Sequence, residues 1–213
     1  MNNVVKNFEN IKNSINNNNA KIIAISKTFS YEKIKPLVDY GHNHFGENKV
    51  QEAYFKWSNV KKSTSSIKLH MVGKLQSNKA RLAVELFDYI HSLDSEKLAK
   101  EIVKYEKLLN KHNKYFIQVN IGNEKQKAGI LVEELESFYN FCKNISLNVV
   151  GLMCIPPNDN NAKKYFVELY KLNNFLKLGQ ISMGMSADYK VAVKCGSTFV
   201  RIGSAIFGDR LVK

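Results

Sequence analysis

Short apolar runs rich in β-branched residues alternate with longer amphipathic stretches from about residue 20 onwards. Short apolar runs are typical of strands buried on both faces of a parallel sheet, and apolar residues at helical spacing indicate helices. The predicted strands occupy residues 22–26, 44–46, 68–72, 89–92, 115–120, 147–154, 180–183 and 199–202. The predicted helices occupy residues 31–40, 50–60, 78–87, 95–109, 132–143, 162–178 and 187–194. Each strand is therefore followed by a helix or a short helical segment.

Strict alternation of strands and helices predicts an α/β fold with a parallel sheet and crossover helices. Eight such units predict a single (β/α)8 TIM barrel, although they are compact for a closed barrel and an open, doubly wound sheet is the alternative. The chain has no internal repeat and no low-complexity linker, which indicates one domain over residues 1–213. Within it, residues 1–19 are predicted to form an amphipathic helix that ends in a run of asparagines, and residues 20–213 the barrel.

The formal net charge of +13 raises the question of nucleic-acid binding. Only three of the 32 basic residues are arginines (Arg81, Arg201 and Arg210), and asparagine and isoleucine are plentiful, as in a genome-wide drift of composition. A dedicated nucleic-acid binder more often uses arginine, whose planar head makes bidentate contacts. We therefore expect no dedicated nucleic-acid partner.

The expected location is the cytoplasm. No stretch of the sequence is long and apolar enough to span a membrane, and the N-terminus lacks the basic start and apolar run of a secretory signal. The three cysteines, Cys142, Cys154 and Cys195, are widely spaced and odd in number. These features predict reduced thiols in a cytoplasmic protein with no membrane partner.

Lys27 directly follows the first predicted strand, and the chemistry of a parallel barrel is expected at such strand ends. Its neighbours Ile25, Ser26 and Phe29 suggest partial desolvation. A desolvated amine is the better nucleophile towards an aldehyde, so Lys27 is a candidate for Schiff-base formation. On position alone, a solvated loop lysine explains Lys27 too, because lysines are numerous in this chain.

Glycine and serine gather after the last two predicted strands, at Ser182, Ser186, Gly203 and Ser204. Barrels often bind phosphate between these two loops, where glycines let backbone N–H groups approach the anion and serine hydroxyls add donors. These four residues are therefore candidates for a phosphate site. The alternative is a pair of ordinary strand-to-helix turns, with Ser186 capping a helix that begins at residue 187.

Arg201 lies within the last predicted strand, where two-residue alternation places it on the same face as Phe199 and Gly203. An inward guanidinium near the phosphate loops would donate to a ring nitrogen or to an anion. An outward salt bridge to a neighbouring helix is the alternative.

Other polar residues give weaker signals. His42 and His44 do not predict a metal site, because no further ligand follows at suitable spacing. Glu47 is either a base or part of an ordinary turn, and Ser26 has no evident histidine partner for a hydrolase. We therefore predict no metal and no catalytic residue from these positions.

A series of motifs runs in order from residue 25 to residue 208. They are residues 25–28 (ISKT), 45–52 (FGENKVQE), 70–79 (HMVGKLQSNK), 118–121 (QVNI), 127–130 (KAGI), 151–153 (GLM), 182–188 (SMGMSAD) and 196–208 (GSTFVRIGSAIFG). Together they resemble the pyridoxal phosphate homeostasis protein family, also described as alanine racemase N-terminal-like proteins. The chain departs from that family in a short N-terminal segment and a short join between residues 178 and 180.

The resemblance implies a (β/α)8 barrel of the alanine racemase N-terminal type that binds pyridoxal 5′-phosphate (PLP). In that family Lys27 matches the lysine that holds PLP as a Schiff base, Arg201 matches an arginine facing the pyridine nitrogen, and Asn48 matches a residue near the ring. Ser186, Gly203 and Ser204 match positions around the phosphate, with Ser182 nearby. Members bind PLP without well-established turnover and affect vitamin B6 balance.

A binder is expected rather than an enzyme. PLP withdraws electrons best when its ring nitrogen is protonated beside an acid, and an arginine there leaves it unprotonated. Racemization also needs a base on each face of the cofactor, and the chain to Lys213 leaves no room for the extra domain that racemases use. The alternative is a PLP-dependent amino-acid racemase or lyase. PLP-requiring apoenzymes are the expected partners, and a monomer is expected, with a dimer left open.

Overall fold

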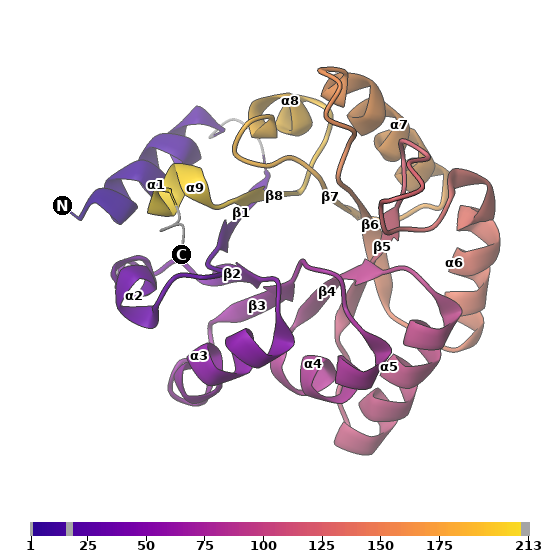
Figure 1. Ribbon diagram of the computed structural model, residues 1–213, viewed down its shortest axis with the longest axis horizontal. Coiled ribbons are helices and arrows are strands. Elements are labelled where there is room, and N and C mark those ends of the chain that lie inside the picture. The colour runs from indigo at the N-terminus through magenta and orange to yellow at the C-terminus, as the bar shows by residue number, and fades with distance from the viewer. Residues whose placement is uncertain (1, 16–18, 210–213) are drawn as a thin grey trace.

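The computed structural model describes residues 2–15 and 19–209, and its eight strands close into a parallel barrel in chain order. Strand β8 pairs with β1, and Figure 1 shows the strands as a central ring with the helices outside it. The strands are β1 (Lys21–Ile25), β2 (His44–Glu47), β3 (Lys68–Met71), β4 (Tyr89–Leu93), β5 (Lys114–Val119), β6 (Val149–Cys154), β7 (Gln180–Ser182) and β8 (Phe199–Ile202). The predicted TIM barrel is confirmed, and the open sheet is wrong.

Each helix buries one apolar face against the barrel, as helical spacing of the apolar residues requires. The helices are α1 (Asn3–Ser14), α2 (Tyr31–Asp39), α3 (Val50–Ser63), α4 (Ala80–Leu86), α5 (Glu96–Leu109), α6 (Leu135–Asn144), α7 (Ala162–Phe175), α8 (Tyr189–Lys194) and α9 (Ser204–Phe207). Short 3-10 turns precede α4 and α6. No helix within residues 2–15 and 19–209 is both long enough and apolar enough to cross a membrane.

Several predicted boundaries are wrong; helix α3, for example, ends at Ser63 rather than residue 60. Helix α7 ends at Phe175 rather than residue 178, because Lys177 adopts a left-handed conformation with φ of 56°. Helix α8 begins at Tyr189 rather than residue 187, and β6 begins at Val149 rather than residue 147. Residues 1 and 16–18 of the predicted N-terminal helix lie outside the described residues, and α1 begins at Asn3.

Helix α1 and the last helix, α9, lie side by side on the outside of the barrel (Figure 1). The Asn7 amide donates to the carbonyl oxygen of Ile206 over 3.1 Å. On the other side of α9, the rings of Phe207 and Phe29 are 5.2 Å apart. These contacts join both ends of the chain to the loop after β1, which carries Lys27.

The barrel interior holds an apolar cluster and several polar side chains. The apolar cluster consists of Ile23, Ile25, Tyr89, Phe116, Met153 and Phe199. His70 on β3, His91 on β4 and Arg201 on β8 are also buried. Because alternate residues of a strand face the same side, His91 shares its face with Tyr89 and Arg201 shares its face with Phe199. The His70 ring stacks on Tyr89. The interior is therefore unusually polar for a barrel core.

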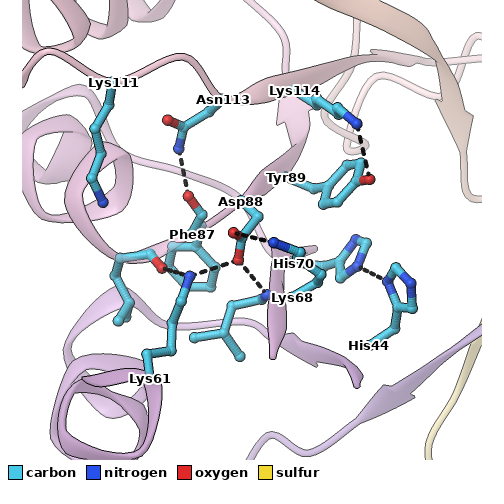
Figure 2. A network of polar contacts seen from close by, with 12 residues as sticks. His44, Lys61, Lys68, His70, Phe87, Asp88, Tyr89, Lys111, Asn113 and Lys114 are labelled. Atoms are coloured by element: carbon cyan, nitrogen blue, oxygen red, sulfur yellow. Dashed lines mark hydrogen bonds and ion pairs between the residues drawn. The ribbon is translucent and has the colours of Figure 1, made fainter. Parts of the chain in front are cut away.

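Lysines surround the end of the barrel at which the strands begin, which we call the lower end. Lys21, Lys68 and Lys114 are the first residues of β1, β3 and β5. Figure 2 shows this region, where the Asp88 carboxylate accepts from Lys61 at 2.6 Å and lies 3.7 Å from the Lys68 ammonium group. One carboxylate thus offsets part of a strongly positive surface.

The buried histidines predict a loss of stability in mild acid. Burial lowers the pKa of His42 and His44 to about 4 and lowers the pKa of His70 and His91 well below the usual 6.5. Between pH 6.5 and pH 4 the unfolded chain therefore binds protons that the folded chain does not. The free energy of unfolding should therefore decrease as the pH is lowered, by up to about 1.4 kcal/mol per pH unit for each histidine.

Urea unfolding followed by the fluorescence of the buried Trp57 measures this slope. Burial raises the pKa of Glu47, which acts in the opposite direction because the folded chain then binds the proton more readily. Equal stability at pH 7 and pH 5 would contradict the prediction.

Candidate functional site

A cavity of about 340 Å³ opens at the C-terminal ends of the strands, where a TIM barrel carries its chemistry. It is lined by Ile25, Lys27, Asn48, Val72, Ile155, Met185, Ser186, Ala187, Arg201, Gly203 and Ser204. The structure therefore brings together all the predicted site residues except Ser182. Ser182 is fully buried at the end of β7 and accepts hydrogen bonds from Arg201, one of the lining residues.

Lys27 occupies the second position after β1, in a loop with a strained backbone. The next residue, Thr28, has a φ of 68°, which a β-branched residue rarely adopts. Its N–H donates to the Glu52 carboxylate over 2.5 Å. The Lys56 ammonium group donates to the carbonyl oxygen of Ser26 over 2.8 Å and to Glu52 over 3.1 Å. Helix α3 thus holds the loop in the conformation that places Lys27 at the cavity.

Glu47 lies fully buried at the end of β2, below this loop. Its Oε1 accepts hydrogen bonds from the Ser26 hydroxyl at 2.7 Å, from Trp57 at 2.9 Å and from Lys56 at 3.0 Å. Burial raises the pKa of Glu47, while Lys56 and the other two donors oppose the rise. Glu47 does not line the cavity, so a supporting role fits it better than the role of a base that the sequence left open.

Arg201 points into the barrel, which rules out the outward salt bridge. Its Nη1 donates to the carbonyl and hydroxyl oxygens of Ser182, both at 2.8 Å, and its Nη2 donates to the carbonyl oxygen of Cys154 at 2.8 Å. None of the ion pairs found among residues 2–15 and 19–209 involves Arg201. Burial lowers the pKa of Arg201, but a guanidinium keeps its charge in proteins. The floor of the cavity therefore carries a fixed positive charge held by neutral acceptors.

The loops after β7 and β8 meet beside this charge. The Ser204 and Ser186 hydroxyl oxygens are 3.4 Å apart. The alternative in which Ser186 caps a helix beginning at residue 187 is wrong, because α8 begins only at Tyr189. In the turn before α8, Asp188 accepts from the N–H of Met185 at 2.6 Å. The Ser186 hydroxyl is therefore left to face the cavity.

The lining suits a small phosphorylated aldehyde. An amine, a guanidinium and two adjacent hydroxyls supply a nucleophile and donors to an anion, while Ile25 and Val72 provide an apolar wall. At Gly203 an added Cβ would lie 3.4 Å from Ile25, an ordinary van der Waals contact, so packing alone does not require glycine there. The donor set fits PLP without further residues.

The predictions from the sequence did not include the residues that support this cavity. Glu52 and Lys56 lie four positions apart on a predicted helix, a spacing at which an ion pair is expected, and that signal was readable. Their contacts with the Lys27 loop depend on tertiary packing. His70 and His91 lie on predicted strands, but their inward orientation follows only from the observed pairing.

No group of three or more histidine, cysteine, aspartate or glutamate side chains able to hold a metal ion occurs within the described ranges. The cysteines within those ranges are free thiols, and burial raises the pKa of Cys142 and Cys154 to about 12. They are therefore poor nucleophiles at neutral pH.

Comparisons with known proteins agree with this geometry. The pyridoxal phosphate homeostasis protein of Haemophilus influenzae is 39% identical over 206 residues, which cover 92% of this chain and 87% of that protein. The protein of the same name from Aquifex aeolicus is 36% identical over 203 residues, with 91% and 88% covered. The structure of PipY from Synechococcus elongatus with PLP bound has a TM-score of 0.85 and 31% identity, and the match covers 96% of this chain and 100% of PipY.

More distant structures share only the fold. Alanine racemase from Clostridium difficile is 16% identical with a TM-score of 0.77, and the match covers 99% of this chain and 58% of the racemase. The family described as alanine racemase, N-terminal domain, matches residues 1–211. The family resemblance predicted from the motifs is confirmed: the chain belongs to the alanine racemase N-terminal domain family and, within it, to the pyridoxal phosphate homeostasis proteins.

Proposed function

We propose that this chain binds PLP in the cavity above Arg201 and serves intracellular PLP homeostasis rather than catalysis. The observation that carries the proposal is that an amine, a guanidinium held by neutral acceptors and two adjacent serine hydroxyls meet in one cavity of about 340 Å³. The relatives named above carry the same function in their names, and PipY has been solved with PLP bound.

Each lining residue has a distinct task in this proposal. Lys27 holds PLP through a Schiff base between its Nζ and the PLP aldehyde, in a loop fixed by Glu52 and Lys56. Ser186, Gly203 and Ser204 surround the phosphate, with Ser182 supporting Arg201 from below.

Arg201 and Asn48 complete the proposed site on the ring side of PLP. Both line the cavity, where Arg201 would face the pyridine nitrogen and Asn48 would lie near the ring. When bound, PLP supplies an electron sink, and the Arg201 charge weakens it by keeping the ring nitrogen unprotonated.

The cavity supports holding PLP more than turning over amino acids. Among its lining residues, all within the described part of the chain, only Lys27 and Arg201 ionize. A racemase needs a base on each face of the cofactor, and Lys27 serves one face at most. The alternative, a PLP-dependent racemase or lyase, lacks a second base on this chain's own cavity walls.

The wider biological role follows from the same proposal. Because a held cofactor serves the cell only when it is passed on, PLP-requiring apoenzymes are the proposed recipients. A cytoplasmic monomer is proposed, in keeping with the free thiols of Cys142, Cys154 and Cys195. Residues 1–213 act in it as one domain.

Replacing Lys27 by Ala should abolish the visible absorbance that wild-type protein acquires with PLP. Borohydride reduction of the wild type followed by peptide mass mapping should place the pyridoxyl group on residue 27. Lys27→Arg keeps the positive charge and should fail equally, because arginine does not condense with the aldehyde. The exposed Lys74→Ala serves as the matched control. Identical spectra for wild type and Lys27→Ala would overturn the assignment.

Removing the Ser204 hydroxyl should weaken PLP binding about tenfold, since a hydrogen bond to a charged group contributes about 1.5 kcal/mol. Pyridoxal, which lacks the phosphate, should bind wild type and Ser204→Ala alike. Titration of both ligands by absorbance measures the two affinities. Ser137→Ala, on an exposed helix surface, is the control. An equal loss for both ligands would place Ser204 away from the phosphate.

Incubation of PLP-loaded protein with L-alanine should yield no D-alanine above the rate of free PLP, because the cavity offers a single base. Chiral chromatography of the products measures this. Saturable turnover that disappears in Lys27→Ala would favour the racemase alternative instead.

A further inference from the structure

Three imidazoles form a hydrogen-bonded column through the barrel interior, which we call the histidine column (His44, His70 and His91). His44 Nδ1 lies 2.9 Å from His70 Nε2, and His70 Nδ1 lies 2.9 Å from His91 Nε2. His91 Nδ1 then lies 2.9 Å from the Ser182 hydroxyl oxygen. The column therefore runs from the lower end of the barrel, where Figure 2 shows His44 beside His70, to the residue beneath the cavity.

Aromatic packing fixes the rings of this column. The His70 ring stacks on Tyr89 with centroids 4.4 Å apart and an interplanar angle of 8°. The His91 ring stacks on Phe116 at 4.3 Å and 19°. His70 and His91 are fully buried. A stacked, buried ring cannot turn freely, so its nitrogens stay directed along the column.

Burial, together with positive charge at both ends, keeps the column neutral. Burial is the main cause that lowers the pKa of His44 and of His91. Lys21 at the lower end then acts on His44, and Arg201 at the upper end acts on His91. A neutral imidazole has one donor nitrogen and one acceptor nitrogen, so all bonds in the column share one direction.

The column ends at the Ser182 hydroxyl oxygen, which also accepts a hydrogen bond from Arg201. Of the three hydrogen bonds that the Arg201 guanidinium donates within the described residues, two go to Ser182, one of them to the hydroxyl that also contacts His91. A serine hydroxyl with a single partner rotates to suit it, whereas one held from two sides is fixed. In either direction of the column the Ser182 oxygen accepts from Arg201, and the contact with His91 fixes the rotation of the hydroxyl between these two partners.

We propose that the histidine column positions Ser182 and, through it, Arg201 at the floor of the PLP cavity. His91, His70 and His44 are then positioning residues that touch no ligand. The inference rests on the proposed function as far as PLP is concerned, but the column itself exists in the protein without any ligand.

Two substitutions of His91, each of which keeps one of its two hydrogen bonds, distinguish this positioning role from simple packing. The amide of Asn reaches the place of Nδ1, so His91→Asn keeps the contact with Ser182 and loses that with His70. The longer amide of Gln reaches the place of Nε2, so His91→Gln keeps the contact with His70 and loses that with Ser182. Loss of one hydrogen bond should weaken PLP binding about fivefold in His91→Gln. His91→Asn should weaken it only about twofold, because the contact that holds Ser182 remains and only the support from His70 is lost.

The absorbance maximum of bound PLP gives a second signature, because it depends on the charge next to the ring. It should move in His91→Gln and stay in His91→Asn. The exposed His112→Asn is the matched control and should change neither affinity nor spectrum. A His91→Asn variant that binds as weakly as His91→Gln, or a His91→Gln variant that matches wild type, would overturn the proposal.

A measurement without PLP keeps the two proposals distinguishable. In the full-length chain with ¹⁵N-labelled histidine, Ser182→Ala should shift the ring-nitrogen resonances of His91 and, more weakly, of His70, while His112 stays in place. If wild type fails to bind PLP but these shifts occur, the proposed function is wrong and the column stands. Unchanged His91 and His70 resonances would overturn the column as a connected unit.

Discussion

Closure of the barrel forces alternate side chains of eight strands into one interior, and this constraint governs the rest of the structure. A polar group there cannot reach water and has to find a partner across the barrel. Arg201 meets this demand with the carbonyl oxygens of Ser182 and Cys154 and with the Ser182 hydroxyl. His91 and His70 meet it with each other. The polar interior is therefore a connected network that reaches the cavity, in contrast to scattered polar residues in an apolar core.

Much of this architecture is predictable because it depends on local periodicity. Alternation of apolar runs and amphipathic stretches gives the strands and helices, and two-residue alternation places Arg201 on the same face as Phe199. Only closure of the barrel shows that this face points inward. Lys27 and Gly203 line one cavity because each lies within two residues of the end of a strand, and parallel strands bring these ends together. The end of α7 and the start of α8 were not predictable, since the left-handed backbone of Lys177 and the turn bonded by Asp188 leave no periodic signal.

The support of the site depends on contacts between distant segments, which periodicity does not encode. Thr28 adopts its rare backbone conformation only because Glu52 accepts its N–H and Lys56 binds the carbonyl oxygen of Ser26. The histidine column likewise depends on the pairing of β2 with β3 and β3 with β4, which sets the height of each ring in the barrel. In both cases the sequence shows the residues themselves but does not show which other residues they contact in the fold.

The choice of acceptors around Arg201 has a chemical consequence for the proposed function. A carboxylate partner would neutralize the guanidinium, whereas carbonyl and hydroxyl oxygens hold it and leave its charge in place. A full positive charge facing the ring nitrogen opposes protonation there and so weakens electron withdrawal by PLP. The same charge attracts the anionic cofactor, and Ser186 and Ser204 add donors beside it. Features that strengthen retention of PLP therefore weaken its reactivity, which is the balance that a homeostasis protein requires.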